Sequence, residues 1–540
     1  MAKPIPASSV GASGNKWPLI LIGAMLVPLT VAIVAWLWGR PWITSDTATG
    51  LIAWNSWRAG GPWNCLLEPD PANLARDVAS WVSWWSPGQY VWPGLFLAFD
   101  LPLGAALLAS SLVAAWIRTT GFFLLLRKLD VSPMAAAAAV FAEAANWQLF
   151  SSFGMYIGGE VVQAALLPWL LLAIALLRSC IAWWPVAIPV LLFSAAFAKH
   201  TLFLAALGAL AWLWWETNLK RPNSWRKWTA TALLLAACVL TARLAVTRWI
   251  IGPGPTPGDP GQVAHGWMLA IGYPLFAPFS SATGFGSVLG RAFAIAGTDV
   301  SQAWQRLGPF LVAAAPLSIF LYVFLAQCIC GESLRRLFIT FTALYLALFA
   351  FLFLRGASVS IEDRHFRPAG MVLIAAIAAI AVDSTSVRRW VRHTLLVALI
   401  ASSAYGLASV AARVTNLHRL ARVAPSGIMQ PNLSPAAAAE LVRRDAQGAS
   451  RDQVIVFCDP CIALELRHSR CLLTDALDRP LAWFQARHWH GRVPHLLLVL
   501  PAAWVDDPRT AALRRCFPIY SAGEWRSDVV GDTLFISAGD

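Results

Sequence analysis

Charged residues are scarce in this sequence. Asp, Glu, Lys and Arg together make up 13% of the 540 residues, whereas a soluble protein of this length carries about a quarter. Acidic residues are fewer than basic ones, with 28 Asp and Glu against 41 Lys and Arg, so the formal net charge is +13. Hydrophobic residues make up 58% of the chain, and the mean hydropathy is +0.61. This balance excludes a soluble globular protein and indicates a polytopic membrane protein.

Other features are absent too. The sequence shows no internal repeat and no long low-complexity tract. Its first hydrophobic run is long and no small-residue cleavage site follows it cleanly, so we expect no cleavable signal peptide. No basic face with interleaved aromatic residues appears in a polar region, so the positive charge does not indicate a nucleic-acid partner. We expect this charge to mark the topology and to contact lipid headgroups.

Long hydrophobic runs are what the sequence does contain. A run of about 17–25 apolar residues is long enough to cross the hydrocarbon of a bilayer. The runs at 134–150, 182–197 and 201–215 are short enough to be half-helices or buried segments. The sequence predicts about eleven spans, near residues 18–38, 101–126, 134–150, 161–177, 182–197, 201–215, 229–250, 308–330, 337–354, 368–382 and 393–412.

Lys and Arg in the short loops predict the orientation, because they concentrate on the cytoplasmic side of a membrane. A cytoplasmic N-terminus places most of the loop Lys and Arg inside, although the inside loops are the shorter set. We therefore expect a multi-pass protein of the plasma (inner) membrane. Eleven spans then leave the C-terminal end on the outer, extracytoplasmic side.

The composition becomes more polar after the last span. We therefore divide the chain into a transmembrane module, 1–413, and a soluble extracytoplasmic domain, 414–540. Within the module we expect outer loops at about 39–90, which is rich in Trp, and at about 251–307, which opens with a run of Gly and Pro. Residues 46–58 are expected to form a short helix along the membrane surface.

The C-terminal domain has the pattern of a small α/β module. Ser434 is expected to cap a helix over 435–444. The apolar runs 454–457 and 496–500 are bounded by turn residues and are expected to be buried strands. Alternation of strands and helices predicts a compact fold.

Four cysteines fall in this domain, where an oxidising space would allow disulfides. The sequence leaves structural disulfides and free thiols open for Cys458, Cys461, Cys471 and Cys516. The spacing of Cys458 and Cys461 also occurs in redox and metal sites. Such a site needs a strand-to-helix context that the sequence does not establish.

Asp46 is a single carboxylate a few residues beyond the first hydrophobic run, flanked by Ser45 and Thr47. A carboxylate there could accept the proton of an attacking hydroxyl, which makes Asp46 the candidate catalytic base. The alternative is structural, since Ser45 or Asp46 would also suit the N-cap of the short helix that follows. The sequence alone leaves both interpretations open.

A second polar cluster, Ile361-Glu362-Asp363-Arg364-His365-Phe366-Arg367-Pro368, precedes a late hydrophobic run. Arginine binds phosphate through paired hydrogen bonds, and a site for a lipid-linked phosphate must place its cations at the headgroup boundary. The structural alternative is a helix start with Pro in its first turn and acids nearby. We take as candidate substrate-binding residues Glu362, Arg364, His365 and Arg367.

Four more charged residues lie at or within the spans. Lys199 lies between two spans. Its side chain could either extend to the membrane interface or serve as a second cation for a phosphate. Glu160 lies at the start of another span. Its carboxylate could either be a helix N-terminal acid or bind sugar hydroxyl groups. Glu143 and Arg243 lie inside apolar runs, so both are expected to face the bundle interior. The histidines of the outer regions show no ligand spacing, and we expect no metal site.

Taken together, these segments resemble the GT-C superfamily of integral-membrane glycosyltransferases, which use polyprenyl-phosphate-linked sugars. The resemblance extends from residue 1 to about 412. It rests on Asp46 in the first outer loop, Trp85-Ser86-Pro87-Gly88-Gln89-Tyr90, Tyr156-Ile157-Gly158-Gly159-Glu160, Lys199 and Arg364-His365-Phe366-Arg367-Pro368. It implies that Asp46 is the general base and that Arg364 binds the donor phosphate.

The sequence departs from the family pattern in two places. Many members carry two adjacent acids in the first loop, but Thr47 follows Asp46 here, so a divalent metal is possible but unsupported and no cofactor is firmly implied. The Trp-Trp-Asp motif of the oligosaccharyltransferase branch is not matched, because Trp84-Trp85 is followed by Ser86.

These observations predict an α-helical, GT-C-like protein of about 11 transmembrane helices with a C-terminal extracytoplasmic α/β domain. The expected activity is inverting transfer of a sugar from a polyprenyl-phosphate donor to a lipid-linked or cell-envelope glycan acceptor at the outer face. A lipid transporter or flippase is disfavoured by the lack of repeated halves. An envelope glycan polymerase or ligase stays open, and it would share the arginines without needing Asp46.

Overall fold

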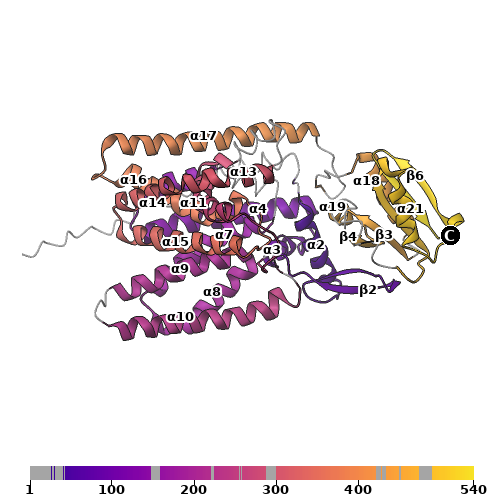
Figure 1. Cartoon of the computed structure of the whole chain (residues 1–540), viewed down its shortest axis with the longest axis horizontal. Coiled ribbons are helices and arrows are strands. Elements are labelled where there is room, and N and C mark those ends of the chain that lie inside the picture. The colour runs from indigo at the N-terminus through magenta and orange to yellow at the C-terminus, as the bar shows by residue number, and fades with distance from the viewer. Residues whose placement is uncertain are drawn as a thin grey trace, which may run out of the picture.

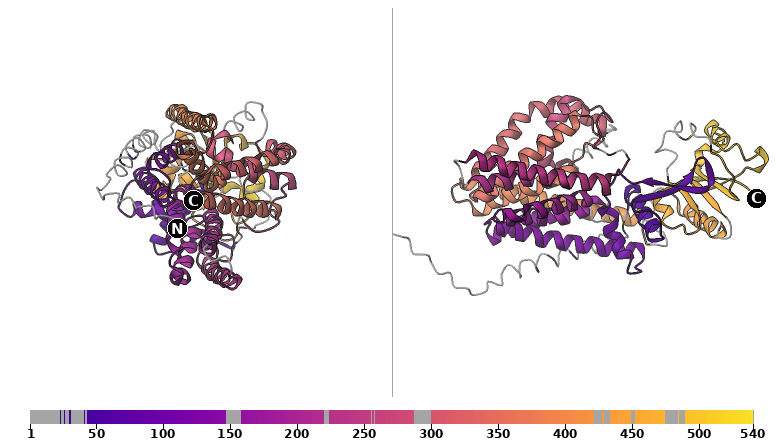
Figure 2. Two further views of the ribbon diagram at one scale, coloured as in Figure 1. Left: turned by 90° about the vertical axis from the view of Figure 1, so that its left-hand side faces the viewer. Right: turned by 90° about the horizontal axis from the view of Figure 1, so that it is seen from below.

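The computed structural model describes residues 41, 43–146, 158–219, 224–254, 256, 258–286, 300–420, 427–428, 433–448, 452–473, 484 and 489–539, and also Gly23, Leu26 and Thr30. Its helices form an elongated bundle, and a smaller domain containing a sheet lies at one end of it (Figure 1). The right-hand view of Figure 2 shows the same two parts from below. We call the end of the bundle nearest the smaller domain the domain end, and the opposite end the far end.

Long apolar helices make up the bundle. Seven are long and apolar enough to cross a membrane. They are α4 (Leu103–Lys128), α7 (Gly159–Leu177), α8 (Trp184–Ala198) with the short η1 (Ile181–Trp183), α10 (Trp225–Val246) with η2 (Thr247–Ile251), α15 (Glu332–Leu354), α16 (Arg367–Asp383) with η3 (Asp363–Phe366), and α17 (Arg389–Leu420). A bent pair, α13 (Val300–Ala313) and α14 (Ala315–Cys328), makes up an eighth candidate span. These eight match eight of the predicted spans.

The other three predicted spans differ. The run 18–38 lies almost wholly outside the described residues. The run 134–150 contains α5 (Pro133–Ala144), whose 12 residues are too few to cross a bilayer. The run 201–215 lies within α9 (His200–Leu219), which has 20 residues but is not among the helices apolar enough to count as spans.

Part of the segment 251–307, which was predicted to be an outer loop, is helical. Helix α11 (Trp267–Thr283) lies there and packs against α13, α15 and α16. Its residues Leu269, Tyr273 and Ala277 belong to the main hydrophobic core. Two prolines lie inside this helix, and proline is normally a sign of a helix break.

Basic loop residues meet at the far end. Arg336, at the start of α15, lies 3.3 Å from the carboxylate of Glu216 near the end of α9. Arg178, at the end of α7, donates to Ser333 Oγ at 3.1 Å. These loops were all predicted to be cytoplasmic, and the structure gathers them at one end of the bundle. The starts of α7 and α9 therefore lie at the domain end.

The first predicted outer segment forms structure at the domain end. It contains α2 (Ser45–Arg58), the antiparallel hairpin of β1 (Cys65–Asp70) and β2 (Asn73–Trp81), and α3 (Gly88–Leu97). Helix α2 lies between the bundle and the smaller domain, close to the range predicted for it (Figure 1). Strand β1 also contacts β4 (Arg470–Leu473) of the smaller domain.

The smaller domain is the α/β module that the sequence predicts. Its five-stranded sheet has the order β4-β3-β5-β7-β6. Strand β3 is parallel to both of its neighbours, β4 and β5. Strand β7 is antiparallel to both of its neighbours, β5 and β6. Ser434 caps α18 by accepting a hydrogen bond from the amide of Ala437 at 3.3 Å, as predicted. The elements are α18 (Pro435–Gln447), β3 (Gln453–Cys458), α19 (Pro460–Ala463), β4 (Arg470–Leu473), β5 (His495–Pro501), α21 (Pro508–Arg515), β6 (Arg526–Val530) and β7 (Thr533–Ala538).

Candidate active site

Glu160 is the centre of an ionic cluster at the domain end. It is the second residue of α7, and only 2% of its surface is exposed. Its Oε1 atom pairs with Lys199 Nζ and lies 3.6 Å from Arg364 Nη1. Lys199 occupies the break between α8 and α9, and Arg364 lies in η3. The fold thus brings together three candidate residues from three separate parts of the sequence.

Arg367 and Glu362 lie beside this centre. Arg367 is the first residue of α16 and lines the same small cavity as Glu160. Glu362 is exposed, and its Oε2 atom lies 2.7 Å from Arg364 Nε. The three cations Lys199, Arg364 and Arg367 outnumber these two glutamates, so the cluster suits a phosphate.

The turn that carries the arginines is anchored on two helices. Asp363 accepts a hydrogen bond from Tyr273 Oη of α11 at 2.8 Å and a second from Ser280 Oγ. Tyr345 of α15 donates to the backbone oxygen of His365 at 2.6 Å. Both anchors are buried, so η3 has a fixed position between α11 and α15.

His365 is buried beside its own loop. Its Nε2 atom lies 3.0 Å from Ser360 Oγ, and its ring lies 6.3 Å from that of Phe349 on α15. These contacts favour a role in holding the turn. Its assignment as a substrate ligand stays a prediction.

Close approach at Gly159 brings Lys199 against the start of α7. A Cβ atom on Gly159 would lie 3.1 Å from Lys199 Cδ and 3.3 Å from Gln89 Oε1. A side chain at this position would therefore require the Lys199 and Gln89 side chains to shift by a few tenths of an ångström. Gln89 borders the cluster, although sequence reasoning gave it no separate role.

Asp46 lies in the first turn of α2, which packs on α3. A Cβ atom on Gly50, one turn further along α2, would overlap the ring of Tyr90 on α3. Tyr90 follows Gln89, which borders the ionic cluster. The candidate base therefore lies on the element next to the candidate phosphate site, at the same end of the bundle.

The interpretation of Ser45 or Asp46 as the N-cap of this helix is wrong. The N-cap residue is Thr44, and its side chain makes no cap hydrogen bond. Asp46 is instead an acid in the first turn, where the helix dipole favours a negative charge. Its role as a general base stays a prediction.

A small polar cavity lies behind the cluster. Its volume is about 30 Å³, which is room for about one water molecule. Glu160 Oε2 and Gln163 Nε2 are buried and have no partner among the described residues. A hydroxyl group donates and accepts, so it would satisfy both atoms. The polar lining residues are Glu143, Asn146, Glu160, Gln163, Ser281 and Arg367.

Sequence reasoning missed the partner of Glu143. Arg118 of α4 is 1% exposed, and its Nε atom donates to Glu143 Oε1 at 2.8 Å. Glu143 does face the bundle interior, as predicted. The available signal was an arginine inside the apolar run 101–126, since such charges are rare in spans. The same prediction is wrong for Arg243, which is exposed on α10.

The ammonium of Lys199 is largely withdrawn from water. Burial lowers the pKa of Lys199 to about 8, and Arg364 lowers it further, whereas Glu160 raises it. The described residues contain no group of three or more His, Cys, Asp or Glu placed to hold a metal ion. The positive charge of the cluster comes from side chains.

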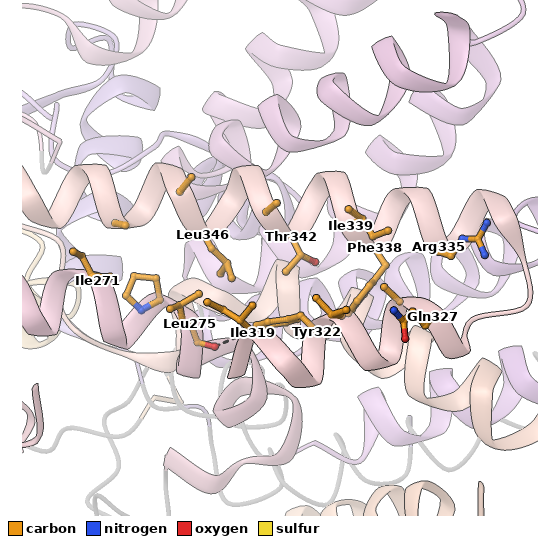
Figure 3. A pocket seen from close by; sticks show the side chains of 16 residues that line it. Ile271, Leu275, Ile319, Tyr322, Gln327, Arg335, Phe338, Ile339, Thr342 and Leu346 are labelled. Atoms are coloured by element: carbon orange, nitrogen blue, oxygen red, sulfur yellow. Dashed lines mark hydrogen bonds between the residues drawn. The ribbon is translucent and has the colours of Figure 1, made fainter. Parts of the chain in front are cut away.

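An apolar groove of about 670 Å³ lies between α11, α14 and α15. Figure 3 shows Ile271 at one end and Gln327 with Arg335 at the other. Tyr273 bonds to Asp363 of η3 from the opposite side of α11, because two residues of a helix turn the side chain more than half-way round the axis from Ile271. From Ala350 to Arg335 the groove follows α15 for roughly 22 Å, at 1.5 Å per residue.

No protein-family model and no curated protein matches this sequence. The structure is similar to that of ArnT from Cupriavidus metallidurans bound to undecaprenyl phosphate, with a TM-score of 0.55, 13% identity, and coverage of 97% of this chain and 98% of that one. It is also similar to the apo state of the same protein, with a TM-score of 0.50, 11% identity, and coverage of 97% and 98%. The chain therefore has the fold of the GT-C membrane glycosyltransferases.

Proposed function

We propose that this protein is a membrane glycosyltransferase that moves a sugar from a polyprenyl phosphate to a lipid-linked or cell-envelope glycan. The observation that carries the proposal is the convergence of Lys199, Arg364 and Arg367 around Glu160 at the domain end of a GT-C fold. Two guanidinium groups and one ammonium match the oxygens of a phosphate. ArnT, which shares the fold, binds undecaprenyl phosphate.

In the proposed reaction the acceptor hydroxyl attacks the anomeric carbon of the donor sugar. Asp46 takes the hydroxyl proton, and the bond between the anomeric carbon and the phosphate oxygen breaks. Attack from the side opposite the phosphate inverts the anomeric centre. Arg364 and Lys199 offset the charge that grows on the departing phosphate.

Glu160 has two tasks in this proposal. Its Oε1 atom orients Lys199 and Arg364 before the donor arrives, since both cations approach that one oxygen. Its Oε2 atom and Gln163 Nε2 border the polar cavity. We place the hydroxyl groups of the donor sugar towards this cavity because they can both donate and accept.

The apolar groove is the proposed site for part of the polyprenyl chain. Its lining is almost wholly hydrocarbon, and it follows α11 and α15, the two helices that anchor η3. A chain anchored by its phosphate at η3 would pass around α11 to enter the groove. The outer face of the inner membrane is the proposed location, because the basic loops gather at the other end of the bundle.

The test uses purified protein in detergent with a panel of polyprenyl-phosphate monosaccharides and an envelope glycolipid extract. The proposal predicts sugar transfer with release of polyprenyl monophosphate for at least one donor, and loss of that release in Arg364→Ala. Release of a pyrophosphate from a pyrophosphate-linked glycan would instead indicate a polymerase or ligase. Movement of the intact donor across liposomes without bond cleavage would indicate a transporter.

A further inference from the structure

The regular alternation of side chains between the two faces of the sheet breaks at the end of strand β3. Val454 and Val456 pack in one core of the smaller domain, and Ile455 packs in the other core, with α18. Regular alternation would place Phe457 with Ile455. Instead, Phe457 joins the core of Val456, and Cys458 joins the core of Ile455.

A backbone distortion at Phe457 causes this exchange. Its φ is 60°, in the left-handed region that a bulky aromatic residue rarely adopts. The register of β3 against β4 also shifts between Val456 and Cys458. Strained backbone of this kind persists only where the surroundings require it, and it is frequent at functional positions.

The distortion places Cys458 beside Cys471. Cys471 lies on the adjacent strand β4 opposite Ile455, so its side chain shares the face that Cys458 has joined. The two thiols are free and lie close enough to affect each other's ionisation. Cys458 is fully buried, whereas Cys471 is partly exposed.

We propose that Cys458 and Cys471 form a disulfide between β3 and β4, and that this bond fixes α19 against the helix that carries Asp46. The second cysteine of the Cys458-Asp-Pro-Cys461 motif has another role. Asp459 caps α19 by accepting from the amide of Cys461 at 2.7 Å, and the Cys461 thiol donates to the backbone oxygen of Ile43 at 3.5 Å.

This arrangement couples the disulfide to the candidate site. Helix α19 contacts α2, and Cys461 shares a hydrophobic cluster with Ile43, Ala48 and Leu51. The segment between Cys458 and Cys471 includes α19, so the bond closes a loop around the part that touches α2. A closed loop has less freedom to open than a linear one.

Formation of the bond removes two protons and two electrons from the thiols, and a disulfide-bonded protein oxidant accepts them as two thiols. The thiolate of the partly exposed Cys471 attacks the disulfide of the oxidant and forms a mixed disulfide with it. Cys458 then attacks the Cys471 sulfur of this mixed disulfide and releases the oxidant as a thiol. The interaction with Cys471 and burial raise the pKa of Cys458 well above its ordinary value. Because Cys458 is fully buried in the folded domain, we place its oxidation before the domain finishes packing, in the oxidising space that the proposed outer-face location supplies.

The test is thiol mapping on the full chain, purified without reductant and alkylated before digestion. We expect a peptide cross-linked through Cys458 and Cys471, with Cys461 alkylated. Reductant should lower the Tm of the wild type by several degrees to that of Cys458→Ser and Cys471→Ser, and it should leave those two variants unchanged. Cys461→Ser is the matched control and should retain the cross-link.

Complete alkylation of both cysteines in protein taken directly from cells would overturn the proposal, as would a bond between Cys458 and Cys461. Mapping of the wild type suffices if the serine variants do not fold. The readout does not use transfer activity, so failure of the proposed glycosyltransferase reaction would leave this result unaffected.

Discussion

At the scale of single residues, Arg364 contributes geometry as well as charge. Its guanidinium lies between Glu160 and Glu362 and presents several donors in a fixed plane. Arg364→Lys keeps the charge and loses the planar fork. We expect binding of polyprenyl phosphate to weaken about 10-fold in Arg364→Lys and about 100-fold in Arg364→Ala, since hydrogen bonds to charged groups contribute about 1.5–3 kcal/mol.

Binding of polyprenyl phosphate in detergent, measured together with Tm, checks this expectation. Arg226→Ala is a suitable control, because Arg226 is an exposed arginine at the start of α10. Unchanged affinity in Arg364→Ala would show that η3 is only the start of a helix.

Lys199 gives the site a pH dependence. Its pKa is lowered to about 8, chiefly by burial, so the side chain is charged at pH 7 and loses its proton as the pH rises to 9. A phosphate monoester is already a dianion across that range, since its second pKa is about 6. We therefore expect the affinity for polyprenyl phosphate to fall between pH 7 and pH 9.

Lys199→Arg separates this effect from other titrations. Arginine stays charged throughout, with a pKa above about 12, so the affinity of this variant should be nearly flat over the same range. An equal fall in the wild type and in Lys199→Arg would assign the pH dependence to another group.

At the scale of elements, α4 and α5 are joined by the buried ion pair of Arg118 and Glu143. Removal of one partner leaves an uncompensated charge in the bundle, at a cost of about 3–5 kcal/mol. We expect Glu143→Ala to lower the Tm markedly, and Arg118→Met combined with Glu143→Leu to recover most of the loss.

Thermal unfolding in detergent measures both variants. Glu332→Ala is the control, because the carboxylate of Glu332 is exposed where it pairs with Arg336, and such pairs contribute about 0–1 kcal/mol. A wild-type Tm in Glu143→Ala would mean that water reaches Arg118 in the bundle.

Hydrophobic length predicted most elements, and it failed where proline or charge interrupts the pattern. Eight of the eleven expected spans correspond to helices or to the bent pair. Helix α11 was missed because Pro274 and Pro278 lie within it. Neighbouring helices bury that segment, and tertiary packing of this kind leaves no periodic signal in one sequence.

The candidate site was predictable as a set of residues and not as an arrangement. Lys199, Glu160 and Arg364 stand out because charge is rare beside apolar runs. Their contact depends on which helix ends meet, and that is a property of the packed bundle. Gln163 gave no signal, since a neutral amide does not stand out in a sequence, and Gln89 belonged to a quoted motif without a role of its own.

At the scale of the whole molecule, the smaller domain and α2 share one end of the bundle, opposite the basic loops (Figure 1). We expect a phosphatase reporter fused after the last residue to be active outside the cytoplasm. A reporter inserted between α9 and α10 should be inactive there, because α9 ends at the far end, where Glu216 pairs with Arg336. Activity of the loop fusion and silence of the C-terminal fusion would reverse the proposed orientation.

The central claim is base-assisted sugar transfer at the domain end, and Asp46→Asn tests it most directly. Asparagine keeps the shape of the side chain and cannot take the proton. The loss of a first-turn acid costs about 0.3–1 kcal/mol of stability, whereas the loss of a general base slows a reaction about 10²–10⁴-fold. The two roles therefore predict different outcomes.

The decisive measurement is the rate of sugar transfer from a saturating polyprenyl-phosphate donor by Asp46→Asn, relative to the wild type. We predict a rate lower by about 10²–10⁴-fold, with donor binding and Tm close to those of the wild type. A rate within a few-fold of the wild type, from an equally stable protein, would contradict the assignment of Asp46 and with it the proposed mechanism.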